Sequence, residues 1–333
     1  MRTEILAVDR EKPGEGPIRR AAGIIRGGGL VVFPTETVYG LGADALSPEA
    51  VRKIFQAKGR PADNPLIVHV EDKKAAALVG QLDERSRRLM DLFWPGPLTL
   101  VVRAAGGIPK EVTGGLDTVA VRMPAHPVAI ALIRSSGVPI AAPSANRSGR
   151  PSPTTAGAVL EDLKGRVELI LDAGPTAVGV ESTVLDVTGD HPVLLRPGGV
   201  SLEDLDEAVG PVLLPTGSEG EGRSPGTRYR HYAPSLPVIL VEAGKARAEG
   251  SHLPGQGARV AYVGMSPPPA GVMAAACFAS VEEYAKGLFS ALMELERSGA
   301  EVILAELPAG EGVGLAVRDR LARAAEFKGP NGT

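Results

Sequence analysis

The chain has 333 residues, of which 44% are hydrophobic and 23% charged, and its formal net charge is -3. This length favours two domains, and the apolar content excludes a disordered chain because it can form buried cores. The slight net acidity argues against a protein that coats nucleic acid. No apolar run is long enough to span a bilayer, so we expect a cytoplasmic protein without a signal peptide or a membrane partner.

Helical and strand patterns alternate through the first two hundred residues. Apolar periodicity, capping residues and Gly or Pro breaks predict helices over 17–26, 48–58, 83–93, 127–135, 154–163 and 201–209. Short apolar runs predict strands over 30–33, 65–70, 98–103, 118–123, 138–142, 169–172, 182–187 and 192–195. Because strands outnumber helices, we expect a mixed α/β sheet flanked by helices.

The pattern changes after residue 209. Residues 210–237 are rich in Gly, Pro and Ser and are typical of a linker. Beyond them we expect a small α/β domain, with strands at 238–241, 259–263 and 302–304 and helices at 281–297 and 314–325. Cys277 is the only cysteine of the chain, which excludes a disulfide framework and a cysteine-rich zinc site; its alanine-rich surroundings favour a buried, inert thiol.

Familiar phosphate-binding and hydrolase motifs are absent from the sequence. Polar residues instead gather in six clusters at strand ends or on strand faces, at 33–42, 58–69, 118–124, 141–152, 181–183 and 195–198. Each cluster alone also fits a structural role, since His69 could be a satisfied core residue and Arg122 could pair with a buried Glu as well as with a ligand. Together, their surplus of Arg and Lys over carboxylates indicates one pocket for an anionic ligand.

These clusters resemble a known family. Residues 34–41, 58–61, 143–146 and 195–198 resemble the YrdC-like domain, whose hallmark is Lys-x-Arg followed later by Ser-x-Asn; here these are Lys58, Arg60, Ser144 and Asn146. Residues 224–234 and 314–321 resemble the longer, two-domain threonylcarbamoyl-AMP synthases, which add a C-terminal Sua-type domain. The resemblance covers about residues 17–325.

The resemblance implies a YrdC-like catalytic domain over 10–209, with a twisted mixed sheet and a deep basic cavity, and a smaller Rossmann-like domain over 238–333. It implies that L-threonine, bicarbonate and ATP give threonylcarbamoyl-AMP and pyrophosphate, with Mg²⁺ bound through ATP and not by protein side chains. A separate transferase complex would then carry the threonylcarbamoyl group to an adenosine next to the anticodon of tRNA, so no stable tRNA binding is expected.

The resemblance also implies the site residues. Those expected to face ATP are Lys58, Arg60, Asn64, Thr118, Ser144, Asn146, Ser152 and Arg196. Those expected to face threonine are Thr37, His69, Arg122, Ala142 through its backbone, and Ser182. Lys58 and Arg60 are the expected catalytic residues, because positioning and charge stabilisation are all that the reaction requires of the protein.

The linker carries one more expectation. Residues 224–234 are unusually aromatic and basic for a spacer, which predicts that segment 210–237 closes over the cavity as a lid with Tyr232 near ATP. These residues could also merely attach the linker to the second domain.

Three other functions fit less well. An RNA-binding module is disfavoured by net acidity and by an aromatic content of only 4%. The related carbamoyltransferase of hydrogenase maturation needs zinc-finger cysteines. A threonine or nucleotide sensor of the same fold would differ only in lacking turnover.

Overall fold

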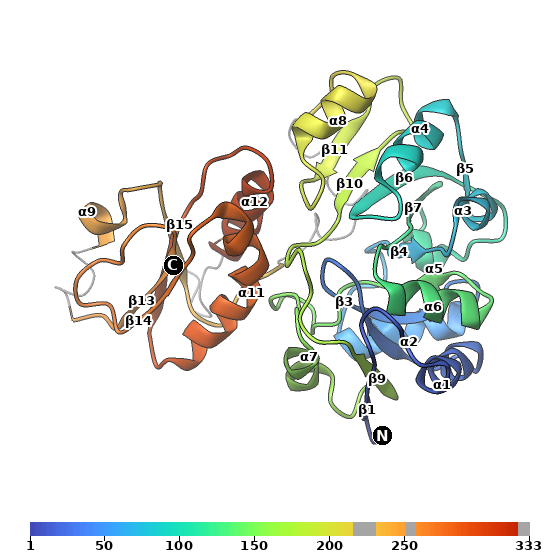
Figure 1. Cartoon of the computed structure of the whole chain (residues 1–333), viewed down its shortest axis with the longest axis horizontal. Helices are drawn as coiled ribbons and strands as arrows, with labels where there is room; N and C mark the ends of the chain where they lie inside the picture. Colours follow the sequence, from blue (N-terminus) through green and yellow to red (C-terminus); the bar gives the residue numbers. More distant parts are fainter. Residues whose placement is uncertain (216–230, 251–256, 326–333) are drawn as a thin grey trace.

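The computed structural model describes residues 1–215, 231–250 and 257–325. Two sheets organise this part of the chain, one of eleven strands before residue 210 and one of four strands after residue 237 (Figure 1). We call them the large unit (residues 1–209) and the small unit (residues 238–325). No helix in the described ranges is both long and apolar enough to cross a membrane.

The large unit alternates strands and helices along the chain. In order, its elements are β1 (Glu4–Ala7), α1 (Glu15–Arg26), β2 (Val31–Pro34), β3 (Tyr39–Asp44), α2 (Pro48–Lys58), β4 (Ile67–His69), α3 (Lys73–Val79), β5 (Gly80–Gln81), α4 (Glu84–Phe93), β6 (Leu98–Ala104), α5 (Lys110–Thr113), β7 (Thr118–Arg122), α6 (Pro127–Ser136), β8 (Ile140–Ala141), α7 (Ala156–Leu163), β9 (Leu169–Asp172), β10 (Thr183–Asp186), β11 (Val193–Arg196) and α8 (Leu202–Val209).

The large sheet is mixed, as predicted. Its order is β1-β9-β2-β3-β8-β4-β7-β6-β10-β11, with β5 on β6. Strands β4 and β7 are parallel, whereas β8 runs antiparallel to β3 and β4. Side chains alternate between two cores: Val31 and Phe33 pack with α1 and α6 on one face, and Val32 packs into the other core. This order brings strand ends that are distant in sequence to one edge.

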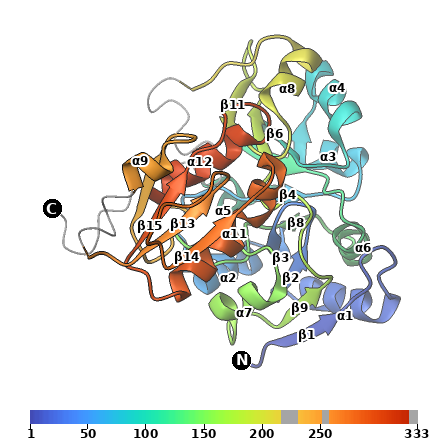
Figure 2. The same cartoon turned by 60° about the vertical axis from the view of Figure 1, so that its left-hand side comes forward.

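The small unit is a parallel sheet with two long helices. Its elements are β12 (Val238–Val241), α9 (Ala246–Gly250), β13 (Val260–Gly264), β14 (Ala274–Cys277), α11 (Val281–Arg297), β15 (Val302–Glu306) and α12 (Gly314–Ala325), with strand order β12-β15-β13-β14. Helix α11 buries an apolar stripe made of Tyr284, Leu288, Leu292 and Leu295. Both views place α11 and α12 on the side of the small sheet that faces the large unit (Figure 1, Figure 2).

The predicted element types are largely confirmed, with three differences. The strands expected at 65–70 and 138–142 are shorter, as β4 and β8. The sequence analysis missed β1, β3, β5 and β14 and the short helices α3, α5 and α9. The expectation of a buried Cys277 is wrong: β14 is an edge strand whose side chains alternate between the two faces, and Cys277 lies on the exposed one.

Candidate functional site

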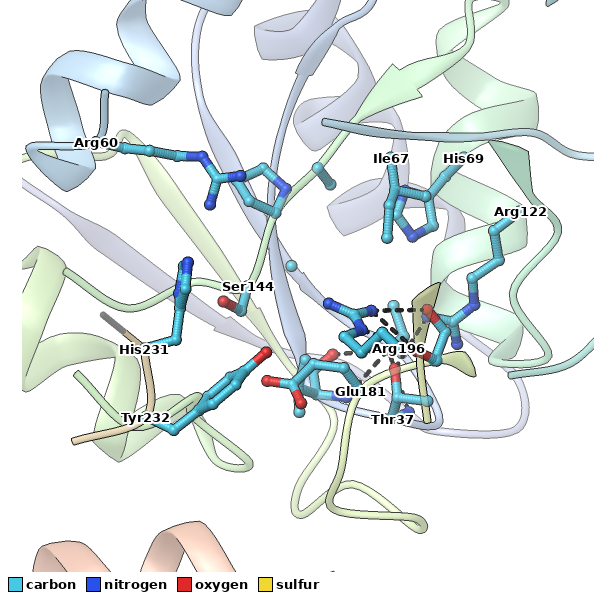
Figure 3. A pocket seen from close by; sticks show the side chains of 16 residues that line it. Thr37, Arg60, Ile67, His69, Arg122, Ser144, Glu181, Arg196, His231 and Tyr232 are labelled. Atoms are coloured by element: carbon cyan, nitrogen blue, oxygen red, sulfur yellow. Dashed lines mark hydrogen bonds between the residues drawn. The ribbon is translucent and has the colours of Figure 1, made fainter. Parts of the chain in front are cut away.

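Polar side chains from distant parts of the described chain meet around one cavity. It lies where several strands of the large sheet begin or end, and His231 and Tyr232 line it from the side of the small unit (Figure 3). The lining residues are Thr35, Thr37, Val38, Gly40, Arg60, Ile67, His69, Arg122, Ala142, Pro143, Ser144, Glu181, Ser182, Arg196, His231 and Tyr232. The structure therefore brings together most of the residues that the sequence singled out.

Arg122 lies at the threonine side of the predicted site. As the last residue of β7, it pairs in register with His69 at the end of β4. Its Nη1 donates to Thr37 Oγ1 at 3.0 Å and its Nε donates to the Gly96 carbonyl at 3.2 Å. Its Nη2 forms an ion pair with Glu36 Oε1 at 2.7 Å. A buried Glu is thus the carboxylate partner, and any ligand carboxylate would share this guanidinium with Glu36.

His69 is a buried imidazole on the cavity wall. Burial, and next the positive charge of Arg122, lower the pKa of His69 to about 3, so the ring is neutral at physiological pH. Its Nδ1 has no hydrogen-bond partner in the described part of the chain, and its ring stands edge-on to Phe33 with centroids 6.1 Å apart. This ring nitrogen is thus available to a polar ligand. The alternative that His69 is a core residue whose hydrogen bonds are all satisfied did not predict this.

Arg196 and Ser182 form a second wall. Arg196 ends β11, and its Nε and Nη2 donate to the Ser182 carbonyl at 3.1 and 2.9 Å. The Ser182 hydroxyl lies 2.8 Å from Thr99 Oγ1 and also accepts from Arg196 Nη2 at 3.2 Å. A Cβ on Gly198 would lie 2.2 Å from the Thr183 nitrogen, so only glycine lets the chain after Arg196 pack this closely.

Arg60 and Lys58 lie on either side of a helix end but have different surroundings. Gly59 closes α2 in the left-handed conformation, which directs the chain away from the helix. Arg60 lines the cavity, and its Nη2 donates to the Pro65 carbonyl at 3.0 Å. Lys58 does not line it; its Nζ donates to the carbonyls of Ser144 and Asn146 and so braces the loop after β8. Burial, and then the charge of Arg60, hold the pKa of Lys58 well below its ordinary value.

The other predicted ATP-side residues lie behind the wall. Asn146 accepts from the Ser144 hydroxyl and donates to the carbonyls of Arg147 and Arg150, so it shapes its own loop. Ser152 donates to Glu181. The Asn64 amide is buried, and neither of its polar atoms has a hydrogen-bond partner among the described residues.

Thr118 is not among the residues that line the cavity. It is buried at the start of β7, whereas Arg122, which lines the cavity, ends the same strand.

Tyr232 lines the cavity and also contacts the small unit. Its ring stacks on Phe289 of α11 with centroids 5.5 Å apart, and its backbone φ is 64°, a conformation rare for a non-glycine residue. The neighbouring His231 is buried, and burial followed by the charges of Arg60 and Lys58 lowers its pKa to about 2. Residues 216–230, most of the predicted lid, lie outside the described residues.

Sequence reasoning did not assign several lining residues. Glu181 stands directly before Ser182 in one of the six clusters, and His231 directly before Tyr232, so proximity in sequence could have found both. Ile67 shares the strand face of His69 by period two. Thr35, Val38, Gly40 and Pro143 lie within two of the same clusters.

The charges around the cavity suit an anionic ligand. Arg60, Arg122 and Arg196 all line it (Figure 3). Its lining carboxylate, Glu181, is bonded to Ser152 and Arg320. Buried guanidinium groups hold phosphate or carboxylate oxygens through charge-assisted hydrogen bonds. Within residues 1–215, 231–250 and 257–325, no three His, Cys, Asp or Glu side chains are arranged to hold a metal ion.

Comparisons with family models cover most of the chain. A model described as "Telomere recombination" matches residues 23–198. A second, described as "Threonylcarbamoyl-AMP synthase, C-terminal domain", matches residues 200–326.

Full-length relatives agree with these models. The chain is 48% identical to a threonylcarbamoyl-AMP synthase of Pyrococcus abyssi, over 96% of this chain and 97% of that one. It is 46% identical to the threonylcarbamoyl-AMP synthase of Bacillus subtilis, over 95% of each. The crystal structure of P. abyssi Sua5 complexed with L-threonine is similar over 96% of this chain and 97% of that chain, with a TM-score of 0.92 and 48% identity.

Proposed function

We propose that this chain, which belongs to the threonylcarbamoyl-AMP synthase family, condenses L-threonine, bicarbonate and ATP into threonylcarbamoyl-AMP and pyrophosphate. The observation that carries the proposal is the convergence of Arg60, Arg122 and Arg196 on one cavity in a chain that matches these synthases from end to end.

The reaction requires the protein to position anions but does not require a nucleophile from the protein. The amine of threonine and bicarbonate combine into a carbamate and water. A carbamate oxygen then attacks the α-phosphorus of ATP, the bond to the β-phosphate oxygen breaks, and pyrophosphate leaves with the electron pair. Because the substrate supplies the nucleophile, the protein contributes orientation and fixed positive charge, which guanidinium groups provide.

The two ends of the cavity divide the substrates. Thr37, His69, Arg122, Ser182 and the backbone at Ala142 form the proposed threonine side, and the L-threonine complex of the P. abyssi relative supports a threonine site in this fold. The threonine carboxylate would share Arg122 with Glu36, while the neutral His69 accepts or donates one hydrogen bond.

The proposed ATP side has two layers. Arg60, Ser144, Arg196 and Tyr232 line the cavity and would contact the nucleotide. Lys58, Asn146 and Ser152 would act through the loops they hold, and we expect Asn64 and Thr118 to contribute at its edge. Of the two residues expected to be catalytic, Arg60 lines the cavity and would face the reacting phosphates, whereas Lys58 would act as a positioning residue through the loop after β8.

Mg²⁺ enters this scheme with the nucleotide. Glu181, the one carboxylate that lines the described cavity, is already bonded to an arginine and a serine. A metal ion would find no free carboxylate there, so we propose that magnesium–ATP is the substrate and that the phosphates hold the ion.

We also propose that segment 210–237 covers the nucleotide. His231 and Tyr232, which lie in its described part, line the cavity, and the Ala233 nitrogen donates to the Gly149 carbonyl at 2.9 Å. A cover would exclude water from a carbamate and an acyl-adenylate, both of which hydrolyse.

The product implies a later step elsewhere. We propose a cytoplasmic enzyme whose threonylcarbamoyl-AMP passes to a separate transferase complex acting on tRNA, with no stable tRNA binding by this chain. Filter binding to tRNA at two salt concentrations tests the last point, because RNA affinity through phosphates would fall steeply with salt.

Pyrophosphate release tests the proposed activity. We expect release from ATP only when both threonine and bicarbonate are present. Release without bicarbonate would exclude the carbamate route, and binding of threonine and ATP without any release would identify a sensor.

A further inference from the structure

The largest fully buried side chain of the small unit ends beside the cavity of the large unit. Arg320 lies on α12 and its exposed fraction is 0%. Its Nε donates to Glu181 Oε2 at 2.7 Å, and its Nη2 donates to the Pro197 carbonyl at 3.0 Å. Both partners belong to the large unit, more than a hundred residues earlier in the chain. Burying an arginine this deeply costs free energy unless its charge is paired and its nitrogens are hydrogen-bonded.

The first contact balances a charge on the cavity wall. Glu181 lines the cavity, and its two oxygens are taken by Ser152 and Arg320. Burial by itself would raise the pKa of Glu181, but Arg320 and Arg196 outweigh burial and hold the pKa below its ordinary value. The carboxylate is therefore ionised, and its charge is compensated by an arginine from the small unit.

The second contact fixes the segment that carries Arg196. Pro197 follows Arg196 directly, and the next residue, Gly198, packs against the backbone of 181–183. A guanidinium that bonds both Glu181 and Pro197 holds these two segments together at the point where Arg196 bonds Ser182.

The third contact is aromatic. The guanidinium carbon of Arg320 lies 5.0 Å from the centre of the Tyr232 ring, which also stacks on Phe289 of α11. Figure 3 shows the Tyr232 hydroxyl pointing into the cavity on the side of Glu181. One side chain of the small unit thus touches three parts of the wall.

We propose that Arg320 is a positioning residue through which the small unit completes the nucleotide side of the cavity: it neutralises Glu181, fixes the Arg196 segment and supports the Tyr232 ring. This inference rests on the proposed function, since it assumes that the cavity takes a polyanionic nucleotide. Without Arg320, Glu181 would leave an uncompensated negative charge facing that polyanion, in a place where water screens little.

A rescue experiment separates this electrostatic role from a merely structural one. We compare Arg320→Met, Glu181→Gln and the double variant, measuring pyrophosphate release against ATP and, separately, against threonine. Arg320→Met should raise the ATP KM by about tenfold or more and change the threonine KM little. Adding Glu181→Gln to Arg320→Met should recover most of that loss, because the uncompensated charge is gone.

Two other results would contradict the proposal in part or in full. A double variant that binds ATP no better than Arg320→Met would overturn the charge-balancing role, and a wild-type ATP KM in Arg320→Met would overturn the proposal entirely. Arg318→Met is the matched control, since Arg318 lies on the same helix and pairs with the exposed Glu242 of the small unit. It should leave both KM values unchanged.

A second variant covers the case in which Arg320→Met does not fold, and the wild-type protein tests the proposed function separately. If Arg320→Met does not fold, Arg320→Lys keeps the charge but loses the planar fork that reaches two partners, so an intermediate ATP KM supports the proposal and a wild-type KM contradicts it. Wild-type protein that releases no pyrophosphate with all three substrates would refute the proposed function instead, which distinguishes the two failures.

Discussion

At the scale of single residues, Arg122 is held before any ligand arrives. Its three nitrogens are engaged by Glu36, Thr37 and Gly96, and its side chain is 4% exposed. A guanidinium fixed in this way presents the same face to every ligand, which lowers the entropy lost on binding. The neighbouring carboxylate of Glu36 partly offsets its charge.

We predict that Arg122→Lys raises the threonine KM by about tenfold, since lysine keeps the charge but cannot reproduce the planar fork. The ATP KM should change little. Steady-state pyrophosphate release at varied threonine measures the effect, with Arg134→Lys as control because Arg134 is 70% exposed and pairs with Glu71. A loss confined to ATP would reassign Arg122 to the nucleotide.

His69 predicts an acid-dependent loss of stability. Its pKa in the folded protein is about 3, below the ordinary value of 6.5, so below pH 6.5 the unfolded chain takes up a proton that the folded chain does not. The free energy of unfolding therefore falls as pH drops from 6.5 towards 3, by about 1.4 kcal/mol per pH unit from this residue.

Urea unfolding at pH 7.5, 6 and 5 measures this slope. In His69→Gln the slope should be shallower than in the wild type, whereas His191→Gln, which changes an exposed histidine, should keep the wild-type slope. Equal slopes for all three proteins would show that His69 takes up its proton in the folded state.

At the scale of elements, β3 shows where sequence reasoning failed. Over residues 33–42, where hydroxyls, a carboxylate and two glycines follow a buried strand, the sequence predicts a strand-end loop and not a second strand. In the fold, a Cβ on Gly42 would lie 2.7 Å from the Phe33 ring and 2.8 Å from Ile140. The glycine is required by neighbours on β2 and β8, and those neighbours are visible only once the strand order is known. Helices with clear capping residues and strands with clear apolar runs were predictable because these sequence signals are local.

The two units also meet through one glycine. Gly179 has a φ of 85°, and a Cβ there would lie 2.3 Å from the Lys286 Cα and 2.5 Å from the Ala285 carbonyl of α11. The loop before β10 thus touches the helix backbone directly, which places Glu181 two residues further on.

We predict that Gly179→Ala destabilises the protein more than Gly174→Ala. Both positions have positive φ, so both substitutions carry about 1 kcal/mol or more of strain, but an added Cβ at Gly174 meets nothing within 4 Å. Only Gly179→Ala should also separate α11 from the loop and raise the ATP KM. Equal losses in unfolding free energy and unchanged kinetics in both variants would contradict a functional contact here.

At the scale of the whole molecule, the site could be predicted only in part. The sequence indicated which residues were polar at strand ends, and most of them meet in the cavity. It could not show that Lys58 and Asn146 would brace a loop or that Arg320 would reach across from the small unit, because these contacts join segments that no local pattern relates.

The docking of the two units depends on a half-buried cluster. Glu296 of α11 accepts from Arg150 at 3.1 and 3.0 Å and from the Ser235 nitrogen at 2.7 Å. A second pair between the units, Arg297 with Glu161, is about half exposed on both sides. Exposed pairs contribute about 0–1 kcal/mol, whereas a shielded bidentate pair contributes more.

We therefore predict that Glu296→Ala increases amide hydrogen exchange at Ser235 and nearby Ala233 by about tenfold or more and raises the ATP KM. Glu161→Ala is the matched control and should change neither. Exchange rates that stay at the wild-type level in Glu296→Ala would mean that the segment before β12 is held by its other contacts.

The central claim is that this cavity joins threonine, bicarbonate and adenylate into one molecule. Mass spectrometry of the reaction with ¹³C-bicarbonate tests it most directly. The account predicts a threonylcarbamoyl-AMP product that carries the label in its carbamoyl carbon and is formed together with pyrophosphate. If ATP is consumed but no adenylate carries the label from bicarbonate, the result would contradict the account.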